Sequence, residues 1–286
     1  MASVAWAQRS LPDSERSSPA NLSVAGCGAQ WRRVSSESRA WGADMIARLG
    51  VTAGMFAMAV TVAGHCAHAA GTAYGVDTAE VSEVGNCKIE SWLSWASNQD
   101  FIGVANPSCV VDLTRPVELS VQLQRSRADG EWGTSAAPKF KTNIIPSAIG
   151  RLGVAVAGGA MFDLVTRENT GFYAYVPATL RLSEVMRINV NAGWLWDRIA
   201  ERHFFTYGAG FDLRTADNVW TLTAEVFGQA GLAETGPEIQ PRFQVGMRWR
   251  PIDRFSVDVI YGRNITGENA NWITLATSIR FPAQEK

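Results

Sequence analysis

Fourteen charged side chains carry the clearest chemical potential in this sequence, because they recur at alternate positions of otherwise apolar stretches. Alternate side chains of a β-strand point to opposite faces, so we expect these residues to line one common surface. Nine are basic and five are acidic, which leaves an excess of four positive charges on that surface. The set is Lys88, Glu90, Glu118, Lys139, Lys141, Arg181, Arg187, Asp212, Glu225, Arg242, Arg248, Arg250, Asp258 and Arg280.

Residues suited to catalysis are sparse. His203 is the only histidine after residue 69, and phenylalanines rather than a serine follow it. Asp197 and Glu201 lie near His203, but carboxylates spread across one loop are weak evidence for a metal site. The glycines of 153–159 fall within a strand pattern that no helix follows, which argues against a dinucleotide fingerprint. We therefore expect no enzyme activity, no cofactor and no metal.

The four cysteines divide into two pairs. Cys27 and Cys66 fall in segments that we expect the mature protein to lack. Cys87 and Cys109 remain, and an even pair in an exported chain predicts a disulfide. The alternative is a pair of buried free thiols.

An export signal is predicted inside the chain rather than at its start. Residues 45–69 contain a Met and an Arg, then an apolar run, then an Ala-His-Ala site, which is the order of a signal peptide cut after Ala69. A buried helix is the alternative for this run. Residues 1–44 have no periodicity and are interpreted as an extension upstream of the true start at Met45, or less favourably as a disordered targeting segment.

Composition narrows the class of protein. The 286 residues are 47% hydrophobic and 19% charged, which excludes wholesale disorder. A net charge of -1 provides no basic field, so we expect no nucleic-acid partner. The apolar runs are too short for a helical membrane protein, whereas a membrane β-barrel remains compatible because its two faces average out in hydropathy.

The elements that must position the charged residues are strands. The region 86–281 has a dominant period of two, as in Phe243, Val245, Met247 and Trp249 against their polar neighbours. Most predicted strands are 10–14 residues long, and a tilted membrane strand needs about 9–11. We predict twelve strands, near 87–97, 108–113, 116–126, 131–145, 150–163, 171–182, 185–197, 203–213, 218–229, 238–250, 255–262 and 270–281.

This pattern predicts an all-β fold, an antiparallel up-and-down transmembrane β-barrel of about twelve strands. A periplasmic segment is expected at 70–85 and a tail at 282–286. Longer loops, around 98–107, 164–170, 230–237 and 263–269, are expected to alternate with tight turns, so that the long loops face outside. A soluble periplasmic β-sandwich is the main alternative fold.

Aromatic and C-terminal residues fit a barrel in a membrane. Tryptophans near strand ends are expected to contribute to interfacial girdles, although a sandwich core would also use them. The set is Trp92, Trp95, Trp132, Trp194, Trp196, Trp220, Trp249 and Trp272. Alternate apolar residues from Ile273 to Phe281 resemble the strand signal read by the outer-membrane assembly machinery, but five further residues follow Phe281.

The chain resembles the uncharacterised outer-membrane β-barrels of proteobacteria that are grouped with the meta-pathway phenol-degradation outer-membrane proteins. Residues 87–92, 115–119, 129–134 and 139–146 carry the resemblance. It implies an outer-membrane location and a transport role, and it supplies no catalytic residues.

We therefore expect an outer-membrane protein whose partners are membrane lipid, the assembly machinery and small solutes. Rings of charged side chains set ion preference in pores, so the basic excess favours a passive pore or solute channel for anionic or aromatic-acid solutes. Two alternatives remain open. The interior charges could pair across strands and fill the lumen, and the barrel could be a closed structural or surface-exposed protein without transport.

Overall fold

The computed structural model describes residues 73–128, 130–233, 236–265 and 270–282. The predicted extension at 1–44 and the predicted signal peptide at 45–69 lie outside the described residues. No helix long and apolar enough to cross a membrane occurs in the described part. Its twelve strands are β1 Asn86–Ala96, β2 Phe101–Asp112, β3 Pro116–Ala128, β4 Glu131–Ile145, β5 Leu152–Asp163, β6 Glu168–Arg181, β7 Met186–Asp197, β8 Arg202–Arg214, β9 Trp220–Ala233, β10 Gly236–Ile252, β11 Phe255–Asn264 and β12 Asn271–Pro282.

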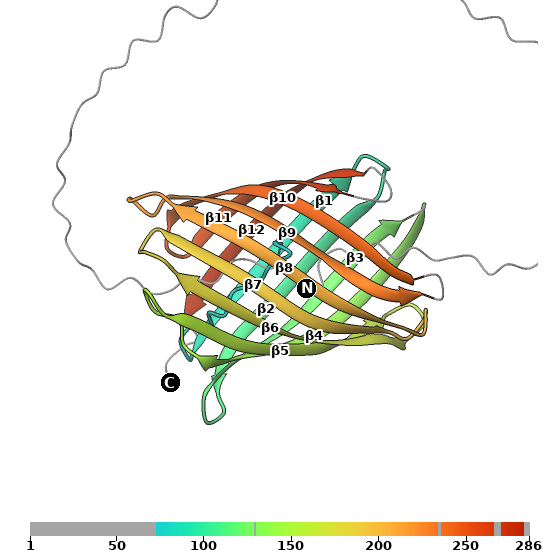
Figure 1. The fold of residues 1–286 in the computed structure, drawn as a ribbon, viewed down its shortest axis with the longest axis horizontal. Coiled ribbons are helices and arrows are strands. Elements are labelled where there is room, and N and C mark those ends of the chain that lie inside the picture. Colours follow the sequence, from blue (N-terminus) through green and yellow to red (C-terminus); the bar gives the residue numbers. More distant parts are fainter. Residues whose placement is uncertain (1–72, 129, 234–235, 266–269, 283–286) are drawn as a thin grey trace, which may run out of the picture. The chain divides into compact units, whose positions relative to one another are not determined.

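The strands form one closed antiparallel barrel in which each strand pairs with its neighbours in sequence (Figure 1). β1 closes the wall against β12 in a register that pairs Cys87 with Phe281 and Trp95 with Ile273. Closure leaves no unpaired sheet edge, which is the condition for a sheet to span a membrane. The predicted fold class and strand number are confirmed.

β2 is twice as long as the sequence predicted. It spans twelve residues, and the stretch expected as a loop at 98–107 is mostly strand. The prediction failed because Ile102 and Val104 face inward, against the apolar Trp92, so the apolar and polar faces are mixed here. Pro107, a residue type that is rare inside strands, lies opposite Ile89 in the ladder with β1.

The connections do not differ in length between the two ends of the barrel. Those that follow odd-numbered strands contain two to six residues, and those that follow even-numbered strands also contain two to six. The predicted alternation of long loops and tight turns is therefore wrong. Residues 230–237, for example, belong largely to β9 and β10. We call the end of the barrel that holds Asn86 and Pro282 the terminal end, and the other the opposite end.

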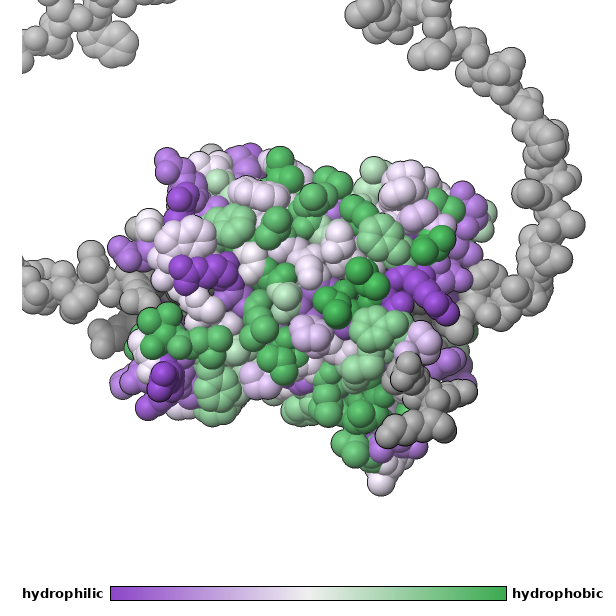
Figure 2. All heavy atoms as spheres, turned by 180° about the vertical axis from the view of Figure 1, so that it is seen from behind, coloured by the Kyte–Doolittle hydropathy of each residue, from purple (hydrophilic) through white to green (hydrophobic). Residues whose placement is uncertain are grey.

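The outer surface of the barrel is apolar. On β12, the alternate residues Ile273, Leu275, Ile279 and Phe281 are 41–55% exposed, whereas Thr274 and Ser278 between them are buried. Figure 2 shows apolar side chains spread over the strands of one face, with hydrophilic residues gathered mainly towards its two ends. A soluble monomer rarely exposes so large a continuous apolar surface, so the alternation fits lipid outside and polar groups inside.

Most predicted girdle tryptophans do face outward. Trp92 and Trp272 are exceptions, since each is only 2% exposed and lies in the lumen. They share the inward parity of the charged residues on β1 and β12, which strand-end position alone did not reveal. The outward set, 38–48% exposed, is Trp95, Trp132, Trp194, Trp220 and Trp249, and Trp196 has the same strand parity as Trp194 and is half-buried.

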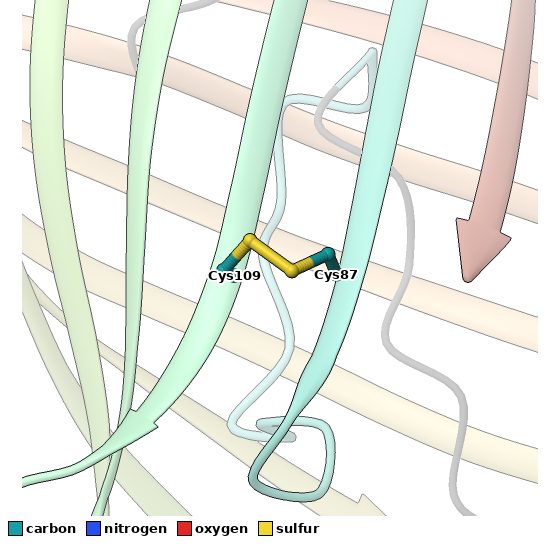
Figure 3. Close-up of a disulfide and its surroundings, with 2 residues drawn as sticks. All are labelled: Cys87 and Cys109. Atoms are coloured by element: carbon teal, nitrogen blue, oxygen red, sulfur yellow. A yellow bond between two sulfur atoms is a disulfide. The ribbon is translucent and has the colours of Figure 1, made fainter. Parts of the chain in front are cut away.

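The predicted disulfide between Cys87 and Cys109 is present (Figure 3). The two residues are direct partners in the β1–β2 ladder, with their Cα atoms 4.0 Å apart. The bond therefore links two neighbouring strands next to the closure of the barrel.

Candidate functional site

The lumen is the candidate site, and the structure places all fourteen predicted charged residues on inward-facing positions. Eleven of them are at most 9% exposed. Lys139, Arg181 and Arg280 are less buried but share the same strand parity. An inward-facing set of this kind would be solvated in an open pore, so its burial indicates that other groups fill the space around it.

That occupant is the segment before β1. Residues 74–80 lie inside the barrel, and Tyr74, Val76, Thr78, Ala79 and Glu80 are each at most 4% exposed. The contacts of the segment reach β4, β6, β7, β9 and β11. We call residues 74–80 the lumen segment. The sequence suggested a periplasmic position for 70–85, but these residues contact the inner wall.

Asp77 is the centre of the polar contacts. Its carboxylate accepts hydrogen bonds from Lys141 Nζ at 2.8 Å and from Tyr175 Oη at 2.7 Å, and Lys139 Nζ lies 3.4 Å away. Burial would raise the pKa of Asp77, but the ammonium groups of Lys141 and Lys139 hold it well below its usual range. The carboxylate is therefore ionised and binds two buried cations on β4.

Glu80 makes the second ionic contact of the lumen segment, towards the terminal end. Arg187 on β7 donates from one terminal guanidinium nitrogen to Glu80 Oε2 at 2.6 Å and from Nε to Asp212 Oδ2 at 2.6 Å. Ser147, in the β4–β5 connection, donates to Glu80 Oε1 at 3.3 Å. One arginine thus joins the segment to two strands of the wall.

Backbone groups of the segment are also bound. Glu225 on β9 accepts hydrogen bonds from the N–H groups of Gly75 and Val76. Ala79 N–H donates to Thr179 Oγ1 at 2.8 Å, and Ala79 C=O accepts from the Asn143 side chain. These contacts satisfy buried backbone groups that would otherwise be costly to keep from water.

Apolar and aromatic contacts complete the fit near the middle of the lumen. Val76 packs with Phe227 and Trp272. The wall makes room for it at Gly208, where an added Cβ would lie 2.8 Å from Val76 Cγ2. The ring of Tyr74 lies under the Arg248 guanidinium, 5.6 Å from the ring centroid, and its hydroxyl donates to Asp258.

Five of the other predicted residues pair within the wall. Lys88 lies 3.4 Å from both Glu90 and Glu118, and Arg248 Nε lies 2.8 Å from Asp258 Oδ1. The lumen therefore combines wall-to-wall ion pairs with ion pairs to the lumen segment.

Sequence reasoning missed the lumen segment because its partners are far away in the chain. Asp77 and Lys141 are separated by 64 residues, and Tyr74 and Asp258 by 184. The one available signal was charge. Asp77, Glu80 and Glu83 precede a set of inward-facing residues with a basic excess, so an acidic segment is electrostatically complementary to that interior.

The one histidine among the described residues, His203, lies outside the lumen. His203 accepts a hydrogen bond from Trp194 Nε1 at 3.2 Å and stacks on Trp194 and Trp196. Within the described ranges, no group of three or more His, Cys, Asp or Glu residues could hold a metal ion. His203 is thus part of an aromatic cluster on the exposed side of β7 and β8.

Comparison with protein families gives one match. Residues 57–281 match the model of the family described as "Uncharacterised conserved protein UCP029691". The chain belongs to this family. Its matched region covers the lumen segment and the barrel almost to the end of β12. No curated protein matches the chain.

Solved structures with a similar fold are outer-membrane barrels. The NanC porin is 6% identical, with a TM-score of 0.54 over 67% of this chain and 98% of that one. The KdgM porin in complex with disordered oligogalacturonate is 8% identical, with a TM-score of 0.52 over 68% and 99%. An outer membrane channel from Pseudomonas putida F1 is 14% identical, with a TM-score of 0.50 over 71% and 98%. At these identities the likeness concerns the fold.

Proposed function

We propose that this protein is an outer-membrane channel for small solutes that is closed by its own lumen segment. The observation that carries the proposal is the position of residues 74–80, which fill a polar lumen without forming part of the wall. Twelve strands fall between small barrels filled by side chains and the wide barrels of open porins, so one peptide segment can close the lumen.

The nature of the contacts supports a displaceable segment. Asp77, Glu80 and the backbone at 75–79 are held by ion pairs and hydrogen bonds, which water or a solute can replace. We propose that the signal peptide at 45–69 is removed after Ala69. Only residues 70–72 would then precede Ala73, so the segment would be attached to the barrel at one end.

The charge of the lumen is what supports our proposal for the class of solute. The fourteen inward-facing residues carry a net of four positive charges, and Asp77 and Glu80 neutralise two of them while the segment is bound. We propose that the opened channel favours anionic solutes, aromatic acids among them, because the basic excess attracts negative charge.

Planar-bilayer recording tests the proposal. We expect the full chain to be closed for most of the time, and a variant without residues 74–80 to conduct. A variant with Gly and Ser at these seven positions is the matched control, because it keeps the length of the chain and removes the side-chain contacts. It should conduct as well.

A structural barrel without transport is the second candidate, and the wall-to-wall ion pairs of Lys88 and Arg248 favour it. Its signature is a deletion variant that folds, as judged by heat-modifiable gel mobility, and does not conduct. This outcome would remove the channel proposal. A reversal potential that indicates cation preference would remove the anion preference alone.

A further inference from the structure

A pocket opens at the terminal end of the lumen, below the lumen segment. Glu80 forms one side, the β6–β7 connection another, and the ends of β8, β9 and β10 the remainder. Five arginines and three carboxylates line it. The pocket is therefore strongly charged. Which of its arginines are already paired with carboxylates decides what it can bind.

Every carboxylate of this pocket is already engaged. Glu80 and Asp212 bind Arg187, and Glu184 lies 3.4 Å from Arg181. Arg248, also in the lining, pairs with Asp258. Arg214 and Arg250 remain, and neither forms an ion pair with any residue in the described ranges.

Both of these arginines carry an unsatisfied donor. The Nε atoms of Arg214 and Arg250 are buried and have no hydrogen-bond partner among the described residues. Arg250 as a whole is only 6% exposed. A buried charged donor without a partner is costly, so the arrangement is complete only with an acceptor bound in the pocket.

The strand register brings the two arginines to one place. Arg214 on β8 is opposite Thr221 on β9, which is opposite Arg248 on β10. Arg250 lies two residues further along β10 on the same face. Arg280 is a further like charge acting on Arg250, so three cationic neighbours raise the positive potential here.

We propose that this pocket binds a small oxyanion, a phosphate or a carboxylate group, between Arg214 and Arg250. Guanidinium groups present planar, fork-like donors that match the oxygens of both anions. The hydroxyl of Thr221, which also lines the pocket, supplies a neutral donor between them. Binding at this mouth does not require the lumen to be open, so it goes beyond the proposed channel.

Isothermal titration of the full chain in detergent tests the site, with inorganic phosphate and acetate as probes at low ionic strength. We expect saturable binding of one anion per barrel. Arg250→Gln and Arg214→Gln should each weaken it about tenfold or more. Arg151→Gln is the matched control, because Arg151 is exposed in a connection at the same end.

Three results would overturn the proposal. The first is a wild-type chain that binds neither anion. The second is equal weakening by Arg151→Gln, which would indicate an unspecific charge effect. The third is binding that appears only after deletion of residues 283–286, because Glu285 or the terminal carboxylate would then be the occupant. Since none of these titrations uses conductance, failure of the channel proposal leaves them interpretable.

Discussion

Asp77→Asn is the substitution expected to open the barrel most effectively. It removes the charge that Lys141 contacts at 2.8 Å and Lys139 at 3.4 Å, and it weakens the acceptor for the Tyr175 hydroxyl at 2.7 Å. Removing one partner of a buried ion pair costs about 3–5 kcal/mol. We take the lower end of that range, because the Asn amide can still accept a hydrogen bond.

The cost falls on the bound state of the lumen segment, since displacement returns the two lysines to water. A loss of about 3 kcal/mol changes the ratio of bound to displaced segment by a factor of about 100. We therefore expect the open probability of single channels to rise about 100-fold, as long as the open state remains the minor state. Asp217→Asn, in the exposed β8–β9 connection, is the control and should leave the open probability unchanged.

A chemical assay checks the same shift without conductance. Thr78 is fully buried, so a cysteine at this position should resist maleimide in the otherwise native barrel. In the Asp77→Asn background it should react quickly. Equal labelling in the two backgrounds, together with equal open probability, would refute the assignment of Asp77 as the main anchor of the segment.

Three further predictions concern acid, the disulfide and the space around the segment. The pKa of Asp77 is held low, so its contribution to binding of the lumen segment is complete above about pH 4 and is lost as the pH falls through the folded pKa. Single-channel openings should therefore increase only below about pH 4. Replacing Cys87 and Cys109 with Ser should lower the free energy of unfolding in urea by about 3 kcal/mol, and an unchanged midpoint would contradict this. Gly75→Ala places a Cβ 2.6 Å from the Phe227 ring, so openings should become more frequent, and a silent variant would show that the ring yields.

The barrel was predictable because its signal is local. The alternation of apolar residues such as Ile273, Leu275 and Ile279 on β12 indicates directly which face of the strand is exposed to lipid. Where both faces are mixed, the signal disappears. Ile102 and Val104 face inward to pack on Trp92, and for this reason the sequence pattern predicts a loop over the first half of β2.

The occupant of the lumen was not predictable in this way. The parity of Lys139, Lys141 and Arg187 indicates that they point inward, but it does not say what neutralises them. Their partners Asp77 and Glu80 precede the barrel and have no periodicity of their own. Only the acidic character of the segment beside a basic interior was visible in the sequence.

A reversible covalent lock tests the central claim most directly. Ala79 N–H lies 2.8 Å from Thr179 Oγ1, so these two positions are neighbours, and we choose them for a pair of cysteines that links the lumen segment to β6 by a disulfide. We predict that the oxidised channel never opens in a planar bilayer and that openings begin when reductant is added. The native chain with the same reductant controls for reduction of the Cys87–Cys109 bond. Identical conductance before and after reduction would contradict closure by residues 74–80.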